Sequence, residues 1–384
     1  MILSEKHQMM KKFFRQFAET EFTTELLDEL EETGEFNWDI FNKLAKAGLT
    51  GTKIPVEFGG QGGDALCYTL MMEELSRVSA VLAIYANTSK SLGGGPLLLC
   101  GTEEQKQKYL VPVAKGEKII AFGLTEPEAG SDAGGTLTTA VEDGDYYILN
   151  GRKTFISAAP FADWAVVYAR TDPNSRGSRG ISMFILDMKL PGVATGKPEQ
   201  KMGIKGYPTS DIIMENVRVP KENLLGPLHR GFSTAMITLD VGRLGTAAQA
   251  LGIAQHALEE SIQYSKDRKQ FGQPIGKHQA ISFMIADMAT EIEAARQLCY
   301  HTALMKDAES PEASKLCAMS KYYTTEMANR VCYKAVQIFG GYGYIKEYPV
   351  ERLYRDVRIT TIFEGTSQVQ QMVISNNLLD FKKR

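Results

Sequence analysis

The chain has 384 residues, 43% of them hydrophobic and 23% charged, a balance typical of a folded protein of two or three domains and unlike that of a disordered chain. Its net charge of −3 gives no electrostatic attraction to nucleic acid or to an anionic membrane surface. No apolar run approaches the ~20 residues of a membrane span, and the N-terminal segment lacks the features of a secretory signal or a transit peptide.

Helices are predicted over residues 1–120. Apolar residues recur there at intervals of three and four, the period of a helix with one buried face. The segments with this period are 5–22, 36–48 and 102–116.

Two glycine-rich stretches, 58–63 and 91–96, are expected to break these helices. The first contains Gly60 and Gly62 ahead of Ala65, a loose match to the dinucleotide-binding fingerprint. Because a proline precedes it and no βαβ unit surrounds it, a turn is the better interpretation.

Strands are predicted from residue 121 to 227, where the apolar period changes to two. The dipeptides Asp143-Gly144 and Asn150-Gly151 favour the positive φ angles of tight hairpin turns. A compact antiparallel β domain is therefore expected in this region.

The helical period returns at residue 228, and three long segments have the pattern of antiparallel helices in a bundle. These segments are 231–268, 278–307 and 311–341. The expected fold is α+β, with an N-terminal helical domain (1–120), a central antiparallel β domain (121–227) and a C-terminal four-helix bundle domain (228–384).

The cysteines and histidines predict neither a disulfide framework nor a metal site. The cysteine count is odd, and neither a C-x-x-C pair nor a paired-histidine spacing occurs, which favours a reducing compartment. The cysteines are Cys67, Cys100, Cys299, Cys317 and Cys332.

Three loops have the composition of ligand-binding segments, although a structural explanation exists for each. The loop 123–135 is rich in small and hydroxyl residues that could bind a heteroaromatic ring or a phosphate, or could simply link two domains. Arg268 follows a long helix, where the dipole alone favours a cation, but it could also hold a pyrophosphate. The glycines of 337–344 could admit a close ligand or end a helix.

Glu364 stands in an unusual place, directly after the apolar residues Ile362 and Phe363. Ser367 and Gln370 form an S-x-x-Q capping box, which predicts a helix start near Ser367. The helix dipole would then favour the carboxylate, whereas the apolar neighbours would favour the acid. Such opposed influences suit a general base, and a simple dipole contact explains the residue equally well.

Five motifs together resemble the acyl-CoA dehydrogenase family over nearly the whole chain. They are LTEPEAGSDAG, RKQFG, HQAISFMIADM, QIFGGYGY and IFEGTSQVQ. The resemblance implies a helical domain, a β domain and a four-helix domain, usually in a homotetramer, with FAD at their junction. It also implies an acyl-CoA or enoyl-CoA substrate and an electron-transferring flavoprotein as redox partner. Bacterial reductases of 2-enoyl- or arylacryloyl-CoA look similar, so either direction of reaction is open.

The resemblance also implies roles for individual residues. The flavin would be lined by Phe122, Leu124, Thr125, Gly130, Ser131, Phe155, Ile156 and Ser157, and completed by Thr366 and Gln368. The FAD of a neighbouring subunit would be contacted by Arg268, Phe271, His278 and Gln279, and its adenosine and pyrophosphate by Gln337, Ile338, Gly340 and Gly341. The acyl-CoA would be contacted by Ser131, Asp240, Arg243, Phe363 and Gly365.

Glu364 falls on the catalytic base of that family. By resemblance it would remove the α-proton of the thioester while the β-hydrogen passes as hydride to flavin N5. Some members carry the base in a D-x-x-R segment instead, and because Gly242 occupies that position here, no rival base is present.

Two departures from the family pattern concern the acyl pocket. Phe363 replaces the Tyr that precedes the base in many relatives, and Lys90 with three glycines stands where a simpler segment is expected. A pocket opened by glycine and lined by Phe363 could admit an aryl or branched acyl group.

Other activities also occur on this scaffold. An oxidase that reduces O₂ directly is the alternative activity, a helical adaptor without FAD is a non-enzymatic one, and Glu364 argues against a monooxygenase. A bacterial cytoplasm is the expected location, in preference to the mitochondrial matrix, since no transit segment is visible.

Overall fold

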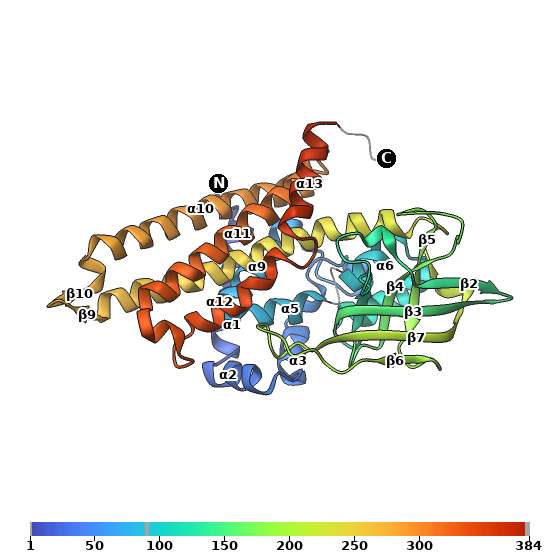
Figure 1. Ribbon diagram of the computed structural model, residues 1–384, viewed down its shortest axis with the longest axis horizontal. Helices are drawn as coiled ribbons and strands as arrows, with labels where there is room; N and C mark the ends of the chain where they lie inside the picture. The colour runs from blue at the N-terminus through green and yellow to red at the C-terminus, as the bar shows by residue number, and fades with distance from the viewer. Residues whose placement is uncertain (1, 89–91, 381–384) are drawn as a thin grey trace.

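The computed structural model describes residues 2–88 and 92–380. The molecule is elongated: a β sheet lies at one end, a bundle of long helices extends to the other, and the N-terminal helices pack between them (Figure 1). The expected α+β fold, with helical, β and helical parts in that order, is confirmed.

The N-terminal part consists of short helices, and several of them begin at a side-chain cap. Ser4, Thr23, Asn37 and Asp64 each accept a hydrogen bond from a backbone N–H of the helix that follows. The helices are α1 (Glu5–Glu21), α2 (Thr24–Thr33), α3 (Trp38–Lys46), α4 (Ala65–Val78), α5 (Ala80–Thr88), α6 (Gly94–Cys100), α7 (Glu103–Gln105) and α8 (Val111–Ala114).

Glycine has different roles in the two glycine-rich stretches. The predicted turn at 58–63 is confirmed, since Gly59 and Gly62 have positive φ and no regular element includes residues 59–63. The second expected break is wrong over its described part, because residues 92–93 are helical and Gly94 opens α6, which continues to Cys100.

The β domain is one eight-stranded sheet in the order β6-β7-β3-β2-β4-β5-β8, with β1 paired to β4. The pairs are antiparallel except that β1 lies parallel to β4 and one residue pair joins β2 to β4 in parallel. The strands are β1 (Ile120–Gly123), β2 (Thr139–Asp143), β3 (Tyr146–Ser157), β4 (Trp164–Arg170), β5 (Ile181–Asp187), β6 (Val193–Thr195), β7 (Thr209–Pro220) and β8 (Leu224–Leu225).

One of the two predicted hairpin turns is wrong. Gly144, with φ of 57°, lies in the turn that joins β2 to β3, as expected. Gly151 instead lies inside β3 at a register shift against β7. A Cβ there would come within 2.4 Å of Thr138 Oγ1, so the glycine allows two backbones to approach closely rather than to reverse direction.

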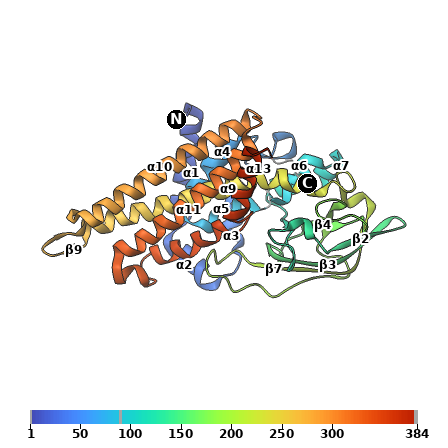
Figure 2. The same cartoon turned by 45° about the horizontal axis from the view of Figure 1, so that its top comes forward.

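The C-terminal part is built on three long helices that run side by side (Figures 1 and 2). They are α9 (Gly231–Asp267), α10 (Gln279–Asp307) and α11 (Ala313–Phe339), followed by α12 (Val350–Val357) and α13 (Ser367–Leu378). A small hairpin of β9 (Lys269–Gln270) and β10 (Gln273–Pro274) joins α9 to α10. The helix α9 also packs on α4 and on β5, so one element connects all three parts of the chain.

A buried ion pair fixes the loop that joins β1 to β2. Lys153 Nζ, on β3, lies 2.7 Å from Glu126 Oε1, and both side chains are almost inaccessible to solvent. The Glu126 carboxylate also accepts hydrogen bonds from Leu137 N and Thr138 N. Although burial opposes ionisation, the charge of Lys153 and these bonds hold the pKa of Glu126 below its usual range.

We expect Lys153→Met to destabilise the fold by roughly 3–5 kcal/mol, because the Glu126 carboxylate would stay buried without its cation. The melting temperature should fall by several degrees at fixed protein concentration. The double variant Lys153→Met/Glu126→Gln, which removes both charges, should recover part of the loss. If Lys153→Met melts at the same temperature as the wild type, the Glu126–Lys153 pair does not hold the loop.

Candidate active site

Glu364 lies in a tight turn between a 3₁₀ segment, Arg358–Thr361, and α13. Glu364 and Gly365 have φ of 54° and 90°, so two successive residues adopt the left-handed conformation. The Glu364 side chain leaves this turn toward α9.

The helix start near Ser367 is confirmed, but the predicted capping box is wrong. The N-cap is Thr366, whose hydroxyl accepts a hydrogen bond from Val369 N. Ser367 Oγ instead donates to Glu326, and Gln370 Nε2 donates to the carbonyl oxygens of Glu364 and Gly365. Gln370 therefore holds the turn that carries Glu364, and Ser367 ties the start of α13 to α11.

The Glu364 carboxylate lies against the backbone of α9 at Gly242. A Cβ added at Gly242 would lie 1.8 Å from Glu364 Oε2, so only glycine leaves room for this carboxylate. Part of the residue is exposed, but Oε2 is shielded from solvent and has no hydrogen-bond partner among the described residues. An unpartnered carboxylate oxygen in a dry site is free to exchange a proton with a ligand.

Burial raises the pKa of Glu364 to about 7, because the ionised carboxylate loses its hydration. The charges of Lys321 and Arg243 and a hydrogen bond from Thr246 act in the opposite direction. A carboxyl group with this pKa can both accept and release a proton near neutral pH, as general acid–base chemistry requires.

Lys321 and Thr246 belong to this site although sequence reasoning did not single them out, and Gln370 belongs to it although it was named only for a capping box. Lys321, on α11, is fully buried, and its ammonium group donates a 2.7 Å hydrogen bond to Gly365 O. A lysine within an apolar helical face was the only available signal, and it does not reveal that residues far apart in sequence meet at this turn.

The predicted substrate residues Asp240 and Arg243 also lie at this end of α9. Arg243 Nη1 donates to Asp240 Oδ1 at 2.6 Å, and the Arg243 side chain is only 5% exposed. Arg243 Nε has no partner within the part of the chain that the structure describes. The Nε–H donor of the guanidinium is thus left for a ligand, near the Glu364 carboxylate.

Of the predicted flavin-lining residues next to β1, Gly130, Ser131 and Phe155 are exposed, whereas Leu124 and Ile156 are buried in the core. Thr154 N donates to Thr125 O, which ties the loop after β1 to β3. Phe155 is 68% exposed, with φ of 57°, and a Cβ at Gly130 would meet no atom within 4 Å. An exposed aromatic ring, hydroxyl side chains and open space above the loop fit a flat heteroaromatic ligand.

Residues 92–95 connect this face to the Glu364 turn. A Cβ at Gly93 would lie 2.4 Å from Ile120 O on β1, and one at Gly95 would lie 3.1 Å from Thr238 on α9. Leu92 Cδ2 approaches the Gly242 position to 3.2 Å. The flavin-side face and the base therefore meet around the start of α6.

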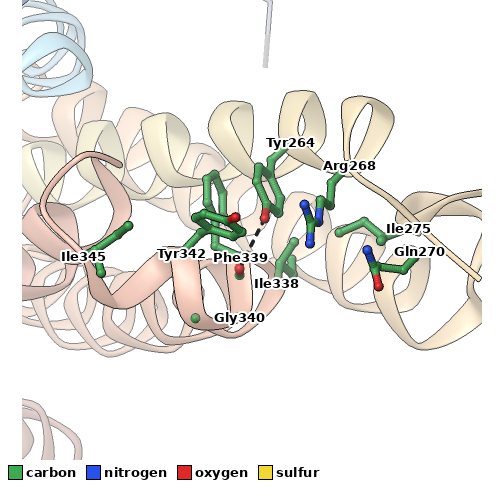
Figure 3. Close-up of a pocket in the computed structure, with 10 residues that line it drawn as sticks. Tyr264, Arg268, Gln270, Ile275, Ile338, Phe339, Gly340, Tyr342 and Ile345 are labelled. Carbon is green, nitrogen blue, oxygen red and sulfur yellow. Dashed lines mark hydrogen bonds between the residues drawn. The ribbon is translucent and has the colours of Figure 1, made fainter.

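A second group of predicted cofactor residues gathers at the far end of the bundle. Arg268 lines a cavity of about 470 Å³ together with Ile338, Gly340 and Gly341 (Figure 3). The Arg268 guanidinium lies 5.2 Å from the Tyr342 ring centroid. The cavity thus combines a cation, aromatic rings and open glycine backbone, which suit a nucleotide with its phosphates.

This distal group cannot reach the Glu364 turn of the same chain. Arg268 follows the end of α9, and Gly242 lies near its beginning, so roughly 40 Å of helix separates them. Phe271 and His278 stand beside Arg268, with ring centroids 5.8 Å apart, and the Phe271 ring is almost fully exposed. Gln279 and Gln337 are exposed at the same end.

Two further expectations concern metals and membranes. Within residues 2–88 and 92–380, no group of three or more His, Cys, Asp or Glu side chains is placed to hold a metal ion. In that same part of the chain, no helix has the length and apolar character needed to cross a bilayer. All five cysteines are free, so no disulfide joins them.

Comparisons with known proteins agree with this geometry. Three family models match: the acyl-CoA dehydrogenase N-terminal domain over residues 4–117, the middle domain over 121–217 and the C-terminal domain over 229–379. The chain is 60% identical over 379 residues to the caffeyl-CoA reductase–Etf complex subunit CarC of Acetobacterium woodii. The match covers 99% of this chain and 100% of that one.

Two other proteins are similar over almost their whole length. The 3-(aryl)acrylate reductase of Clostridium sporogenes is 54% identical, and the match covers 99% of this chain and 100% of that one. The structure of butyryl-CoA dehydrogenase from Megasphaera elsdenii superposes with a TM-score of 0.95 at 44% identity, covering 99% of both chains.

The dry position of Glu364 predicts a cost in stability that depends on pH. Because the folded pKa of about 7 lies above the ordinary 4.5, the folded state binds this proton more tightly. The free energy of unfolding therefore falls as pH rises from 4.5 through 7, by roughly 3 kcal/mol for a shift of this size. We expect Glu364→Gln to melt above the wild type near pH 8, and the difference to shrink near pH 5. An equal difference at both pH values would contradict the raised pKa.

Proposed function

The chain belongs to the acyl-CoA dehydrogenase family, and we propose that it reduces aryl-substituted 2-enoyl-CoA thioesters with electrons from an electron-transferring flavoprotein. It is an oxidoreductase of the CH–CH group of acyl-CoA, and the same site run in reverse is a dehydrogenase. The observation that carries the proposal is the unpartnered, solvent-shielded Oε2 of Glu364 beside Gly242.

Glu364 moves the proton at the α carbon of the thioester. In the reducing direction the neutral carboxyl group gives its proton to Cα, and in the oxidising direction the carboxylate takes that proton away. A pKa of about 7 leaves both forms available near neutral pH. The family resemblance assigns the Glu364 N–H to the thioester carbonyl, where a hydrogen bond would stabilise the enolate.

The cofactor proposed for this site is FAD, since members of the family are flavoproteins. Bound FAD supplies the hydride exchange at the β carbon. Phe122, Leu124, Thr125, Gly130 and Ser131 would line one side of its ring. Phe155, Ile156 and Ser157 on β3 would line another, and Thr366 and Gln368 would complete the site. The open space above Gly130 and the exposed Phe155 ring support this assignment.

The distal cavity supports an assembly in which one chain completes the site of another. Arg268, Gly340 and Gly341 line it, yet roughly 40 Å of α9 separates them from the Glu364 of their own chain. In the homotetramer of the family, they would hold the adenosine and pyrophosphate of a neighbouring subunit's FAD. Phe271, His278, Gln279, Gln337 and Ile338 would join them.

An aryl substrate is supported by two similar reductases and by residues near the base. The relatives from Acetobacterium woodii and Clostridium sporogenes are named as caffeyl-CoA and 3-(aryl)acrylate reductases, and their bacterial origin supports a bacterial cytoplasmic location. Phe363 and Gly95 would border the acyl group. Gly93 does not open the pocket as expected, because the backbone of β1 occupies the space that a side chain at this position would need. Lys90 lies outside the described residues.

The redox partner proposed is an electron-transferring flavoprotein. The name of the relative from Acetobacterium woodii describes a subunit of a reductase–Etf complex. The oxidase alternative requires rapid reduction of O₂ by the purified protein, which an oxygen electrode measures directly.

The function is tested by anaerobic half-reactions with a panel of thioesters. The second-order rate constant for flavin reduction by arylpropionyl-CoA should be at least ~10-fold above those for butyryl- and octanoyl-CoA, because one well-filled pocket contributes about 1–3 kcal/mol of discrimination. A preference for the straight octanoyl chain would contradict the aryl assignment. Glu364→Gln should bleach orders of magnitude more slowly, and bleaching at the wild-type rate would remove Glu364 as the base.

Gly242→Ala should slow flavin reduction strongly while the protein still folds and binds FAD. The new methyl group would stand 1.8 Å from the present position of Glu364 Oε2, so the carboxylate has to turn away. Val241→Ala, which alters the neighbouring residue of α9 without adding an atom, is the matched control. Equal rates for Gly242→Ala and the control would show that the carboxylate acts from a different position.

A further inference from the structure

Lys321 is a buried cation whose ammonium group has a defined acceptor. Its side chain is fully buried on α11, and Nζ donates to Gly365 O at 2.7 Å. A lysine is rarely kept in such a place without a specific partner, because burial of the charge is expensive. Its partner here is the carbonyl group directly after the catalytic Glu364.

We propose that Lys321 is a positioning residue of the reaction, which clamps the turn of Glu364 and supplies the positive charge that keeps this carboxylate available as a base. The inference rests on the proposed role of Glu364. It goes beyond that role because it assigns the geometry and the acidity of the base to a residue on another helix.

The geometric part of the inference follows from the left-handed turn. Glu364, with φ of 54°, adopts a conformation that is unfavourable for a residue with a side chain, so the surroundings have to hold it there. Lys321 and Gln370 do so from two helices, because both donate to Gly365 O, at 2.7 and 2.9 Å. Gln370 also donates to Glu364 O at 3.3 Å.

The electrostatic part follows from the charges that face the carboxylate. Lys321 approaches it from α11 and Arg243 from α9, while Asp240 pairs with Arg243 and Glu326 lies on the α11 side. After burial, Lys321 has the largest influence on the pKa of Glu364 and lowers it. Burial lowers the pKa of Lys321 itself to about 8, so the lysine still carries its charge at pH 7.

The two contributions are separable by mutation. Lys321→Met removes the charge and the donor, and Lys321→Gln removes the charge but keeps a neutral donor on a side chain one bond shorter. Gln370→Leu removes a neutral donor from Gly365 O and Glu364 O. Loss of the charge raises the pKa of Glu364, so the rising limb of the flavin-reduction rate moves to higher pH. A shift of one unit makes reduction by acyl-CoA about 10-fold slower at pH values below the wild-type pKa.

The experiment measures flavin reduction by stopped flow across pH in the tetrameric holoenzyme, with hydrogen exchange of residues 362–368 as a second readout. Lys321→Met and Lys321→Gln should both move the rising limb to higher pH, by at least about one pH unit. Gln370→Leu should leave the limb in place but speed exchange in the turn, as Lys321→Met also should.

A limb unchanged in both Lys321 variants would overturn the inference, even if the rates fall, because a purely structural lysine changes rate without changing the pKa. If Lys321→Met does not fold, Lys321→Gln decides. The two failures are distinguishable: a Glu364→Gln variant that bleaches normally would refute the proposed function, whereas an unchanged limb in the lysine variants beside a slow Glu364→Gln variant would refute only the role of Lys321.

Discussion

The site depends on the loss of water around one carboxylate. Glu364 Oε2 lies against the α9 backbone, without solvent and without a hydrogen-bond partner among the described residues. Dehydration favours the neutral acid, and only the two cations and one hydroxyl group around it keep ionisation within reach of neutral pH. Gly242, the left-handed turn and the buried Lys321 all serve to maintain that balance.

Each of the three parts of the chain contributes residues to this site. The β domain presents an open face of aromatic and hydroxyl groups, and its loop is fixed by the Glu126–Lys153 pair. The C-terminal part supplies the base from the turn before α13 and the surface it packs on from α9. The N-terminal part supplies residues 92–95, which touch both. The distal cavity at Arg268 lies at the other end of α9, and under the proposed function it would serve the FAD of a neighbouring subunit.

Local sequence patterns predicted much of this arrangement. The change of apolar period identified the helical and strand regions, and the position of Glu364 before a helix start followed from the residues after it. Gly242 was recognised as the absence of a second base, but its role in making room for Glu364 required coordinates.

The failed predictions concern motifs whose residues make contacts with distant segments instead of the local contacts that the motif predicts. Asn150-Gly151 has the sequence of a hairpin turn, yet Gly151 lies inside β3, where the absence of a side chain leaves room for Thr138. Ser367 and Gln370 have the spacing of a capping box, yet they bond to Glu326 and to the Glu364 turn. Lys321 could not be found at all from its neighbours, because its partner is distant in sequence.

The central claim is that dehydration sets the acidity of Glu364, and an infrared titration of the carboxyl group tests it most directly. The C=O stretch of the protonated acid is followed against pH in the ligand-free protein and assigned by its absence from Glu364→Gln. A midpoint near 7 is the predicted result. A midpoint near 4.5, the ordinary value for a hydrated glutamate, would contradict the account.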